Sequence, residues 1–217
     1  MCACMSATRR TALIALAFAA SAPAAFGAPA PQPQLSPEDS ALVASAVAYL
    51  EGLPASKGRF VQTDARGGVA QGTFYLQRPG KARFEYDPPS SIVMASNGSV
   101  VAILNSRLKT YEAYPLGATP LSLFLARQIR LDRGVRVSRV IRVSDGFSIV
   151  ASDIHKKTEG SLTLSFSQAP IALQGWTITD AQGQSTRLRL DDFAAAGPFQ
   201  SSLFSLKDPR VQSPTRR

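Results

Sequence analysis

The sequence predicts a mainly β protein, in which short antiparallel strands form one strongly curved or nearly closed sheet accompanied by apolar helices. From Ser56 onward, apolar and polar side chains alternate with a period of two, as in strands with one buried face. Turn signals separate these runs, and Asn97-Gly98 and Asp145-Gly146 are strong signals for tight hairpins. Many short strands with frequent turns are typical of a curved antiparallel meander.

The first 27 residues have the features of a secretory signal peptide. Arg9 and Arg10 give a positive start, and Thr11 to Ala22 is an apolar stretch too short to span a bilayer. Ala25 and Gly27 satisfy the small-x-small rule for cleavage after Gly27. The two adjacent arginines leave a twin-arginine route open, but the residues around them support it weakly, so the Sec route is favoured.

Removal of this signal defines the expected mature protein. Cys2 and Cys4 leave with it, so the remaining 190 of 217 residues contain no cysteine and form no disulfide. A chain of this length suits a single domain whose core is large enough without crosslinks. We expect a Pro/Gln-rich linker over residues 28–35, one domain over 36–217, and a soluble protein in the periplasm.

The protein is basic, and its arginines cluster. The formal charge of +9 falls to +7 when Arg9 and Arg10 are removed. Arginine recurs every third residue at positions 127, 130, 133, 136, 139 and 142. These side chains form either a solvated strand face or a docking surface for acidic partner proteins or anionic lipid head groups. Arg136 and Arg142, expected on one strand face, are the docking candidates. Nucleic acid is not an expected partner.

Two helices are predicted. Ser36 is the expected N-cap of the first, with Pro37 in its first turn, and Gly52 marks its end. Its apolar stripe consists of Leu42, Val43, Ala46, Val47 and Leu50. The second helix follows Thr119-Pro120, which should cap and start it, and runs over residues 121–126. Its residues are apolar on nearly every side, so it must be buried or face an apolar ligand.

Eleven apolar runs predict the strands. They cover residues 59–64, 69–78, 82–87, 92–96, 100–104, 109–113, 135–144, 147–153, 161–167, 176–180 and 185–191. In the second run, Phe74, Leu76 and Arg78 share the inner face because strand side chains alternate. An inward arginine is costly unless it is paired. This cost suggests that Arg78 has a specific function, and our hypothesis is a conformational switch.

The sequence carries no recognisable catalytic machinery. His155 is the only histidine, and there is no Gly-x-Ser-x-Gly elbow for a Ser-His-Asp triad. With no cysteine after the signal, zinc and iron sites are not expected. Asp191 and Asp192 should alternate to opposite strand faces, so they do not act together unless a bulge intervenes. We expect neither an enzyme nor a protein with a cofactor or a metal.

A curved sheet with apolar helices can instead shelter an apolar ligand. The candidate cavity residues lie on the predicted inner faces or on the second helix: Phe60, Phe74, Leu76, Phe84, Tyr86, Leu121, Phe124 and Leu125. The alternative interpretation of the same residues is a plain hydrophobic core.

Several motifs, in order, resemble the LolA family of periplasmic outer-membrane lipoprotein carriers. They are Gly58-Arg-Phe-Val-Gln62, residues 72–76, Arg78-Pro-Gly-Lys81, Phe84-Glu-Tyr86 with Pro89, Asn97-Gly98, Thr119-Pro120 and residues 176–184 with Thr186. The resemblance implies an unclosed antiparallel β-barrel with an α-helical lid over an apolar cavity. It also implies that Arg78 matches the family arginine that holds the lid shut through hydrogen bonds.

The function implied by the resemblance is that of a shuttle. We expect a monomer that does not bind nucleic acid. Such a carrier accepts lipoproteins from an inner-membrane lipoprotein-releasing ABC transporter, shields their acyl chains and delivers them to an outer-membrane acceptor. Two positions depart from the family pattern: Ala82 stands where an aromatic is common, and Phe84 replaces a tryptophan. The alternative is a LolA-like module that binds, carries or senses another lipid.

Overall fold

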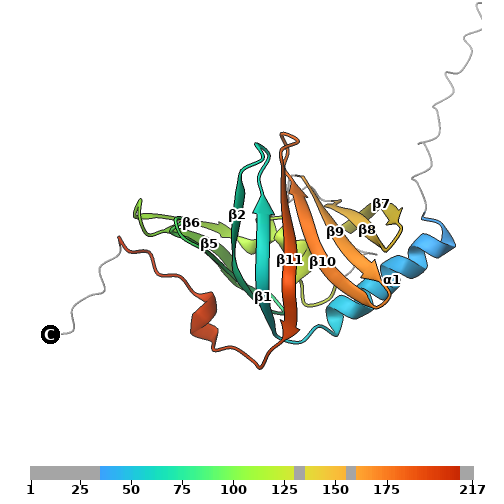
Figure 1. Cartoon of the computed structure of the whole chain (residues 1–217), viewed down its shortest axis with the longest axis horizontal. Coiled ribbons are helices and arrows are strands. Elements are labelled where there is room, and N and C mark those ends of the chain that lie inside the picture. The colour runs from blue at the N-terminus through green and yellow to red at the C-terminus, as the bar shows by residue number, and fades with distance from the viewer. Residues whose placement is uncertain (1–34, 130–134, 155–159, 211–217) are drawn as a thin grey trace, which may run out of the picture. The chain divides into compact units, whose positions relative to one another are not determined.

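The computed structural model describes residues 35–129, 135–154 and 160–210, which lie within one compact unit, 33–217. Within these ranges the chain forms one eleven-stranded antiparallel sheet and two α-helices, α1 (Pro37–Glu51) and α2 (Leu121–Leu125) (Figure 1). The predicted mainly β fold with an unclosed sheet is confirmed. None of the described helices is both long and apolar enough to cross a membrane. The predicted signal peptide lies outside the described residues.

The sheet consists of two meanders joined by one pair of strands. The first contains β1 (Ser56–Thr63), β2 (Val69–Gln77), β3 (Lys81–Tyr86), β4 (Ile92–Asn97), β5 (Val100–Asn105) and β6 (Thr110–Pro115). The second contains β7 (Val135–Val143), β8 (Gly146–Asp153), β9 (Ser161–Gln168), β10 (Ile171–Thr179) and β11 (Ser185–Ala195). Strand β11 pairs with β1, so β6 and β7 are the two edges and the sheet stays open (Figure 1).

The sequence predicted all eleven strands but not this order, because it suggested a single meander. After β6 the chain moves to the far edge and returns to β1. The last two strands are also longer than predicted. A register shift between Leu173 and Gly175 interrupts the alternation in β10, and Asp192 adopts a positive φ of 51° in β11. Irregularities of this kind remove the period of two by which a strand is recognised.

Helix α1 begins and ends as predicted. The Ser36 hydroxyl accepts a hydrogen bond from the Asp39 N–H at 3.0 Å, Pro37 is the first helical residue, and Gly52 is the C-cap. Such a cap satisfies one of the free N–H groups at a helix start. Val43, Ala46 and Leu50 from the predicted stripe are buried.

The start of α2 differs from the prediction. Pro120 occupies the N-cap position, and the Thr119 hydroxyl donates instead to the carbonyl of Leu116 at 2.8 Å. Thr119 therefore closes a short 3-10 helix, η1 (Leu116–Ala118), rather than capping α2. The predicted burial of the apolar α2 is confirmed, because Leu121, Phe124 and Leu125 are all buried.

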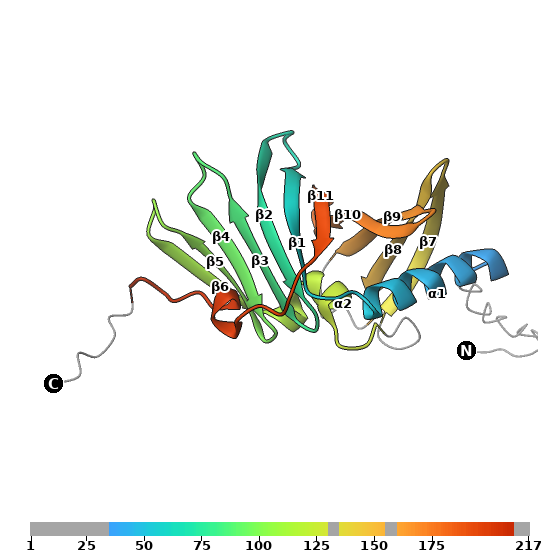
Figure 2. The same ribbon diagram turned by 60° about the horizontal axis from the view of Figure 1, so that its bottom comes forward.

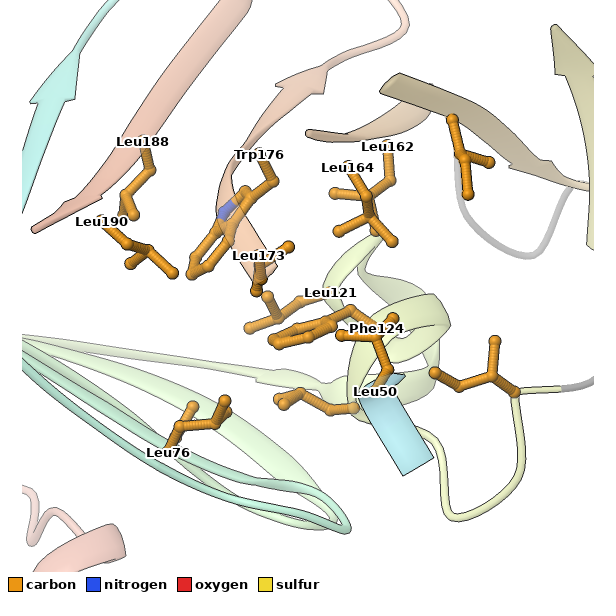
Figure 3. Packing of buried hydrophobic residues seen from close by; sticks show 14 of the residues in the cluster. Leu50, Leu76, Leu121, Phe124, Leu162, Leu164, Leu173, Trp176, Leu188 and Leu190 are labelled. Atoms are coloured by element: carbon orange, nitrogen blue, oxygen red, sulfur yellow. The ribbon is translucent and has the colours of Figure 1, made fainter. Parts of the chain in front are cut away.

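Both helices lie on the inner face of the sheet, and the hydrophobic core lies between them and the strands (Figure 2). Figure 3 shows Leu50 of α1 beside Phe124 of α2, with Leu162 and Leu164 of β9 directed toward the same region. Helix α1 contacts β10, and α2 contacts β8. The helices therefore cover the β7–β11 half of the sheet more than the β1–β6 half.

A segment after β11 covers part of the outer face of the other half. The Phe199 N–H donates to Gln77 Oε1 at 2.7 Å, and the Phe199 ring stands edge-on to Tyr75, with centroids 5.5 Å apart. Arg83 on β3 donates to the Leu203 carbonyl at 2.9 Å, next to the buried Phe204 of η2 (Ser201–Phe204). Figure 2 shows this segment running along the β1–β6 half.

Candidate functional site: a clamped helical lid beside an apolar cavity

Arg78 follows β2 directly and contacts the C-terminal ends of both helices. Its Nη1 donates to the carbonyl of Leu50 in the last turn of α1, and its Nη2 donates to the carbonyl of Ala126, the C-cap of α2, at 2.5 Å. The Gly80 N–H donates to the Leu125 carbonyl at 2.8 Å. Helix ends leave such carbonyls free, and a cation is favourable there. One short loop therefore holds two helices that are far apart in sequence.

The environment of Arg78 makes this clamp moderate in strength. No ion pair to Arg78 occurs among the described residues, and burial lowers the pKa of its guanidinium, partly offset by the charge of Glu51. Its Nε is buried without a hydrogen-bond partner in the described structure. A buried donor without a partner costs free energy, whereas a charge-assisted hydrogen bond stabilises. In Arg78 the cost of the unpartnered Nε therefore offsets part of the stabilisation from the two Nη hydrogen bonds.

Arg142 contacts the opposite end of α1. Its guanidinium donates to Glu38 Oε2 at 2.8 Å and to Asp39 Oδ1 at 2.7 Å, in the first turn of the helix. The hydrogen bond from Arg142 lowers the pKa of Asp39, and the hydrogen bonds to Glu38 and Asp39 raise the pKa of Arg142. These groups are exposed or partly exposed, so solvent weakens the interaction.

The two docking candidates do not share a strand face, contrary to the prediction. A bulge in β7 between Val137 and Arg139 shifts the register, so Arg136 pairs with Ser152 and Arg142 pairs with the buried Phe147. Ser152 and Phe147 lie on opposite faces of β8, because they are an odd number of residues apart. Arg136 therefore lies on the outer face, whereas Arg142 lies on the inner face toward α1. Positions 130 and 133 lie outside the described residues.

An apolar cavity of about 280 Å³ lies beside α2, between the two halves of the sheet. Its lining comes from both meanders, η1–α2 and the strands at their junction: Gln62, Tyr86, Met94, Val101, Ile103, Tyr114, Thr119, Pro120, Leu121, Trp176, Ile178, Thr186 and Leu188. Figure 3 shows Leu121 facing Trp176, with Leu188 beyond it. The described lining contains no charged side chain.

The candidate cavity residues fall into two groups. Tyr86 and Leu121 line the cavity. The other six are buried in the core next to it: Phe60, Phe74, Leu76, Phe84, Phe124 and Leu125. The Phe84 and Trp176 rings are 5.9 Å apart, and the Phe124 and Trp176 rings are 5.5 Å apart. The core residues thus form the support of the cavity wall and are not exposed in this structure.

Of the thirteen lining residues, sequence reasoning predicted only Tyr86 and Leu121; two of those it missed show why. Trp176 joins the cavity wall to α2, and Gln62 is a polar residue on an inner face. The alternation in β1 places Gln62 on the same face as Phe60, which was the available signal. Ala82, at the position where the family often has an aromatic, is buried opposite Leu76 of β2.

The described residues contain no cluster of three or more His, Cys, Asp or Glu side chains that could hold a metal ion. His155, considered for a catalytic triad, lies outside the described residues. The described residues bring together two helix ends contacted by one arginine and an apolar cavity, the kind of concave apolar space in which small ligands bind.

Comparison with known proteins gives the family. Residues 51–207 match the family model described as outer membrane lipoprotein carrier protein LolA. An outer-membrane lipoprotein carrier protein from Chromohalobacter salexigens is 28% identical over 172 residues, covering 75% of this chain and 80% of that protein. One from Methylibium petroleiphilum is 27% identical over 149 residues, covering 64% of this chain and 70% of that protein.

Among solved structures, a LolA superfamily protein from Nitrosomonas europaea is 9% identical, with a TM-score of 0.45 over 75% of this chain and 97% of that chain. The family model covers most of the chain, including β1–β11, α2, Arg78 and the whole cavity lining, but only the last residue of α1, Glu51. The chain therefore belongs to the LolA family of outer membrane lipoprotein carrier proteins.

Proposed function

We propose that this protein is a periplasmic carrier that shields the acyl chains of lipoproteins and shuttles them from the inner membrane to the outer membrane. In this role it receives cargo from an inner-membrane lipoprotein-releasing ABC transporter and passes it to an outer-membrane acceptor. The mature form begins after the signal peptide of residues 1–27. Membership of the LolA family and the apolar cavity support the proposal.

The physical task of such a carrier is to replace the membrane as a shelter. Each acyl methylene kept from water contributes about 0.8 kcal/mol, so a chain of many methylenes does not leave a bilayer unaided. The carrier must bind the chains well enough to extract them and weakly enough to release them. A lid that closes in the empty state meets this need, because the cost of opening subtracts from the binding free energy.

The clamp by Arg78 is the single observation that carries the proposal. It joins the ends of α1 and α2 to the loop after β2, so opening the lid breaks two charge-assisted hydrogen bonds. Each is of the order of 1.5–3 kcal/mol, which is a suitable size for a reversible latch. The cavity of about 280 Å³ lies below the range of roughly 300–1,000 Å³ for small-ligand pockets. Cargo with several acyl chains therefore requires the lid to open.

The test uses Arg78→Leu, which keeps apolar bulk and removes the donors. We expect the variant to bind a fluorescent fatty acyl probe more tightly than wild type and to release lipoprotein poorly to the acceptor in a reconstituted transfer assay. Arg66→Leu is the matched control, because Arg66 is exposed in the β1–β2 turn. A variant that melts well below wild type without binding the probe more tightly would contradict the latch.

Docking to partners is proposed at the outer face of β7. Arg136 and Arg139 are exposed there and have no ion pair among the described residues, whereas Arg142 already contacts α1. Replacing Arg136 and Arg139 with Gln should weaken binding to an acidic partner most at low salt and change the melting temperature little. Unchanged binding at low salt would contradict docking at this face and indicate that these arginines are simply solvated.

A second candidate function follows from the size of the cavity. In the closed state it suits one apolar chain better than three, which favours a LolA-like module that carries or senses another lipid. Mass spectrometry of material co-purified from the periplasm separates the two functions. Triacylated lipoproteins support the carrier, and free phospholipid or glycolipid supports the alternative.

A further inference from the structure

One inner-face residue of β1 brings polar hydrogen-bonding groups into the apolar cavity. Gln62 Oε1 accepts a hydrogen bond from the Tyr86 hydroxyl at 2.6 Å, and burial raises the pKa of that hydroxyl, so it stays protonated as a donor. The other end of the amide, Nε2, has no hydrogen-bond partner among the described residues. Both side chains line the cavity. A free amide donor therefore borders a space whose walls are otherwise mostly apolar.

Gly72 makes this arrangement possible. In the register of β1, β2 and β3, Phe60 lies opposite Gly72, and Gly72 lies opposite Tyr86. A Cβ atom on Gly72 would stand 2.8 Å from Phe60 Cε1 and 2.0 Å from the Glu85 carbonyl oxygen. Without that atom, side chains from β1 and β3 meet above β2, and the Phe60 and Tyr86 rings pack edge to face at 5.1 Å. The packed Tyr86 ring then fixes the amide of Gln62.

Thr186 supplies a second polar group on the neighbouring strand. It lies two residues from Leu188, the partner of Gln62 in β11, and so shares the same face. Thr186 also lines the cavity, and its hydroxyl has no partner among the described residues. Diagonal neighbours on one sheet face lie within reach of a common ligand group.

We infer that Gln62, together with Thr186, recognises the neutral carbonyl oxygen of an acyl ester or acyl amide bound in this cavity. Amide and hydroxyl donors bind acceptor oxygens, and a hydrocarbon chain alone offers them nothing. A carboxylate or phosphate is a poorer match, because the described lining carries no cation to pair with it. The inference rests on the proposed acyl-binding function and adds the position of the acyl group's polar end.

The test compares ligands of one chain length that differ in a single group. A long-chain methyl ester, the corresponding N-methyl amide and the matched methyl alkyl ether compete with a fluorescent fatty acyl probe on the full mature chain. Wild type should bind the ester and the amide about three- to tenfold more tightly than the ether, as one neutral hydrogen bond provides. The relative strengths of ester and amide show which acyl linkage is preferred.

Three variants locate the effect. Gln62→Leu should lose the preference for ester and amide over ether, while the ether binds at least as well as to wild type. Tyr86→Phe keeps the ring and removes the hydroxyl that orients the amide, so the preference should fall without vanishing. Gln71→Leu is the matched control, because Gln71 is exposed on the opposite face of the neighbouring strand, and its preference should equal that of wild type.

The outcomes separate this inference from the proposed function. Equal binding of ester and ether to wild type, or an unchanged preference in Gln62→Leu, would overturn the inference and leave acyl binding intact. Failure of wild type to bind the probe at all would overturn the proposed function itself.

Discussion

The two ends of α1 are each held by an arginine, but by different chemistry. At the C-terminal end, the half-buried Arg78 donates to backbone carbonyls of two helices. At the N-terminal end, the exposed Arg142 pairs with the carboxylates of Glu38 and Asp39. The Arg78 contact pairs a cation with neutral carbonyls in a partly buried site. The Arg142 contact pairs a cation with carboxylates at the surface.

This difference divides the control of the lid between its ends. Backbone carbonyls do not titrate and are little affected by salt, so the Arg78 contact should be insensitive to solution conditions. Exposed ion pairs are screened by salt and lost when the carboxylates become protonated. We therefore expect the first turn of α1 to loosen before its last turn. The whole helix should move away from the sheet only when the hydrogen bonds from Arg78 break.

The largest expected effect comes from removing the C-terminal clamp. In Arg78→Leu, amide hydrogen exchange in the last turn of α1 should speed up roughly 10- to 100-fold, because charge-assisted hydrogen bonds of about 1.5–3 kcal/mol are lost. The first turn of α1, held by Arg142, should change less. Equal acceleration along the whole helix would show that the two ends do not open separately.

Arg78→Lys separates the effect of charge from that of directed hydrogen bonds. It keeps the positive charge but removes the two Nη donors of the guanidinium. A lysine ammonium does not reproduce the fixed pair of donors that contact two carbonyls at once. We expect exchange at the C-terminal end of α1 to rise by roughly three- to tenfold, between wild type and Arg78→Leu. Protection equal to wild type would assign the effect to charge at the helix ends rather than to the two directed bonds.

A smaller effect is expected at the other end of the helix. Arg142→Gln should increase exchange in the first turn of α1 a few-fold and shift the melting temperature by at most about 2–4 °C, since exposed ion pairs contribute little. Arg139→Gln on the same strand, without an ion pair in the described structure, is the control. Raising the salt concentration should make wild type resemble Arg142→Gln at this end only.

The smallest effect is a dependence on acidity. The hydrogen bond from Arg142 lowers the pKa of Asp39 in the folded state, so its contribution to stability is present above the unfolded pKa near 3.8. It is lost as the pH falls through the lower folded value. Exchange rates normalised to the intrinsic rate should therefore rise at the first turn of α1 only below about pH 4. Loss of protection between pH 7 and 5 would contradict this assignment.

Local patterns predicted the elements well. Alternation gave eleven strands, and the Ser36-Pro37 signal gave the start of α1, because both depend on neighbouring residues. The same alternation placed Arg78 on the inner face. Its partners were beyond sequence reasoning, since Leu50 and Ala126 are 28 and 48 residues away and contribute only their carbonyls. Every residue has a carbonyl, so the sequence does not mark which one a side chain contacts.

Irregular positions account for most of the differences. The bulge in β7 reverses the face of Arg142 relative to Arg136, and the period of two gave no warning of it. The irregularity near Gly175 concealed the first residues of β10. Gln62 was overlooked for the opposite reason: its strand is regular, but a polar residue on an apolar face gains meaning only from the cavity beside it.

The pairing of β1 with β11 has a consequence for how the molecule is made. Phe60 lies opposite Leu190, 130 positions later in the chain, and this pair of strands is the only link in the described sheet between its two halves. Contacts so distant in sequence form slowly, because a large loop must close first. During synthesis the two halves of the sheet stay separate until its last strand emerges, so the complete sheet and the cavity between its halves form only at the end.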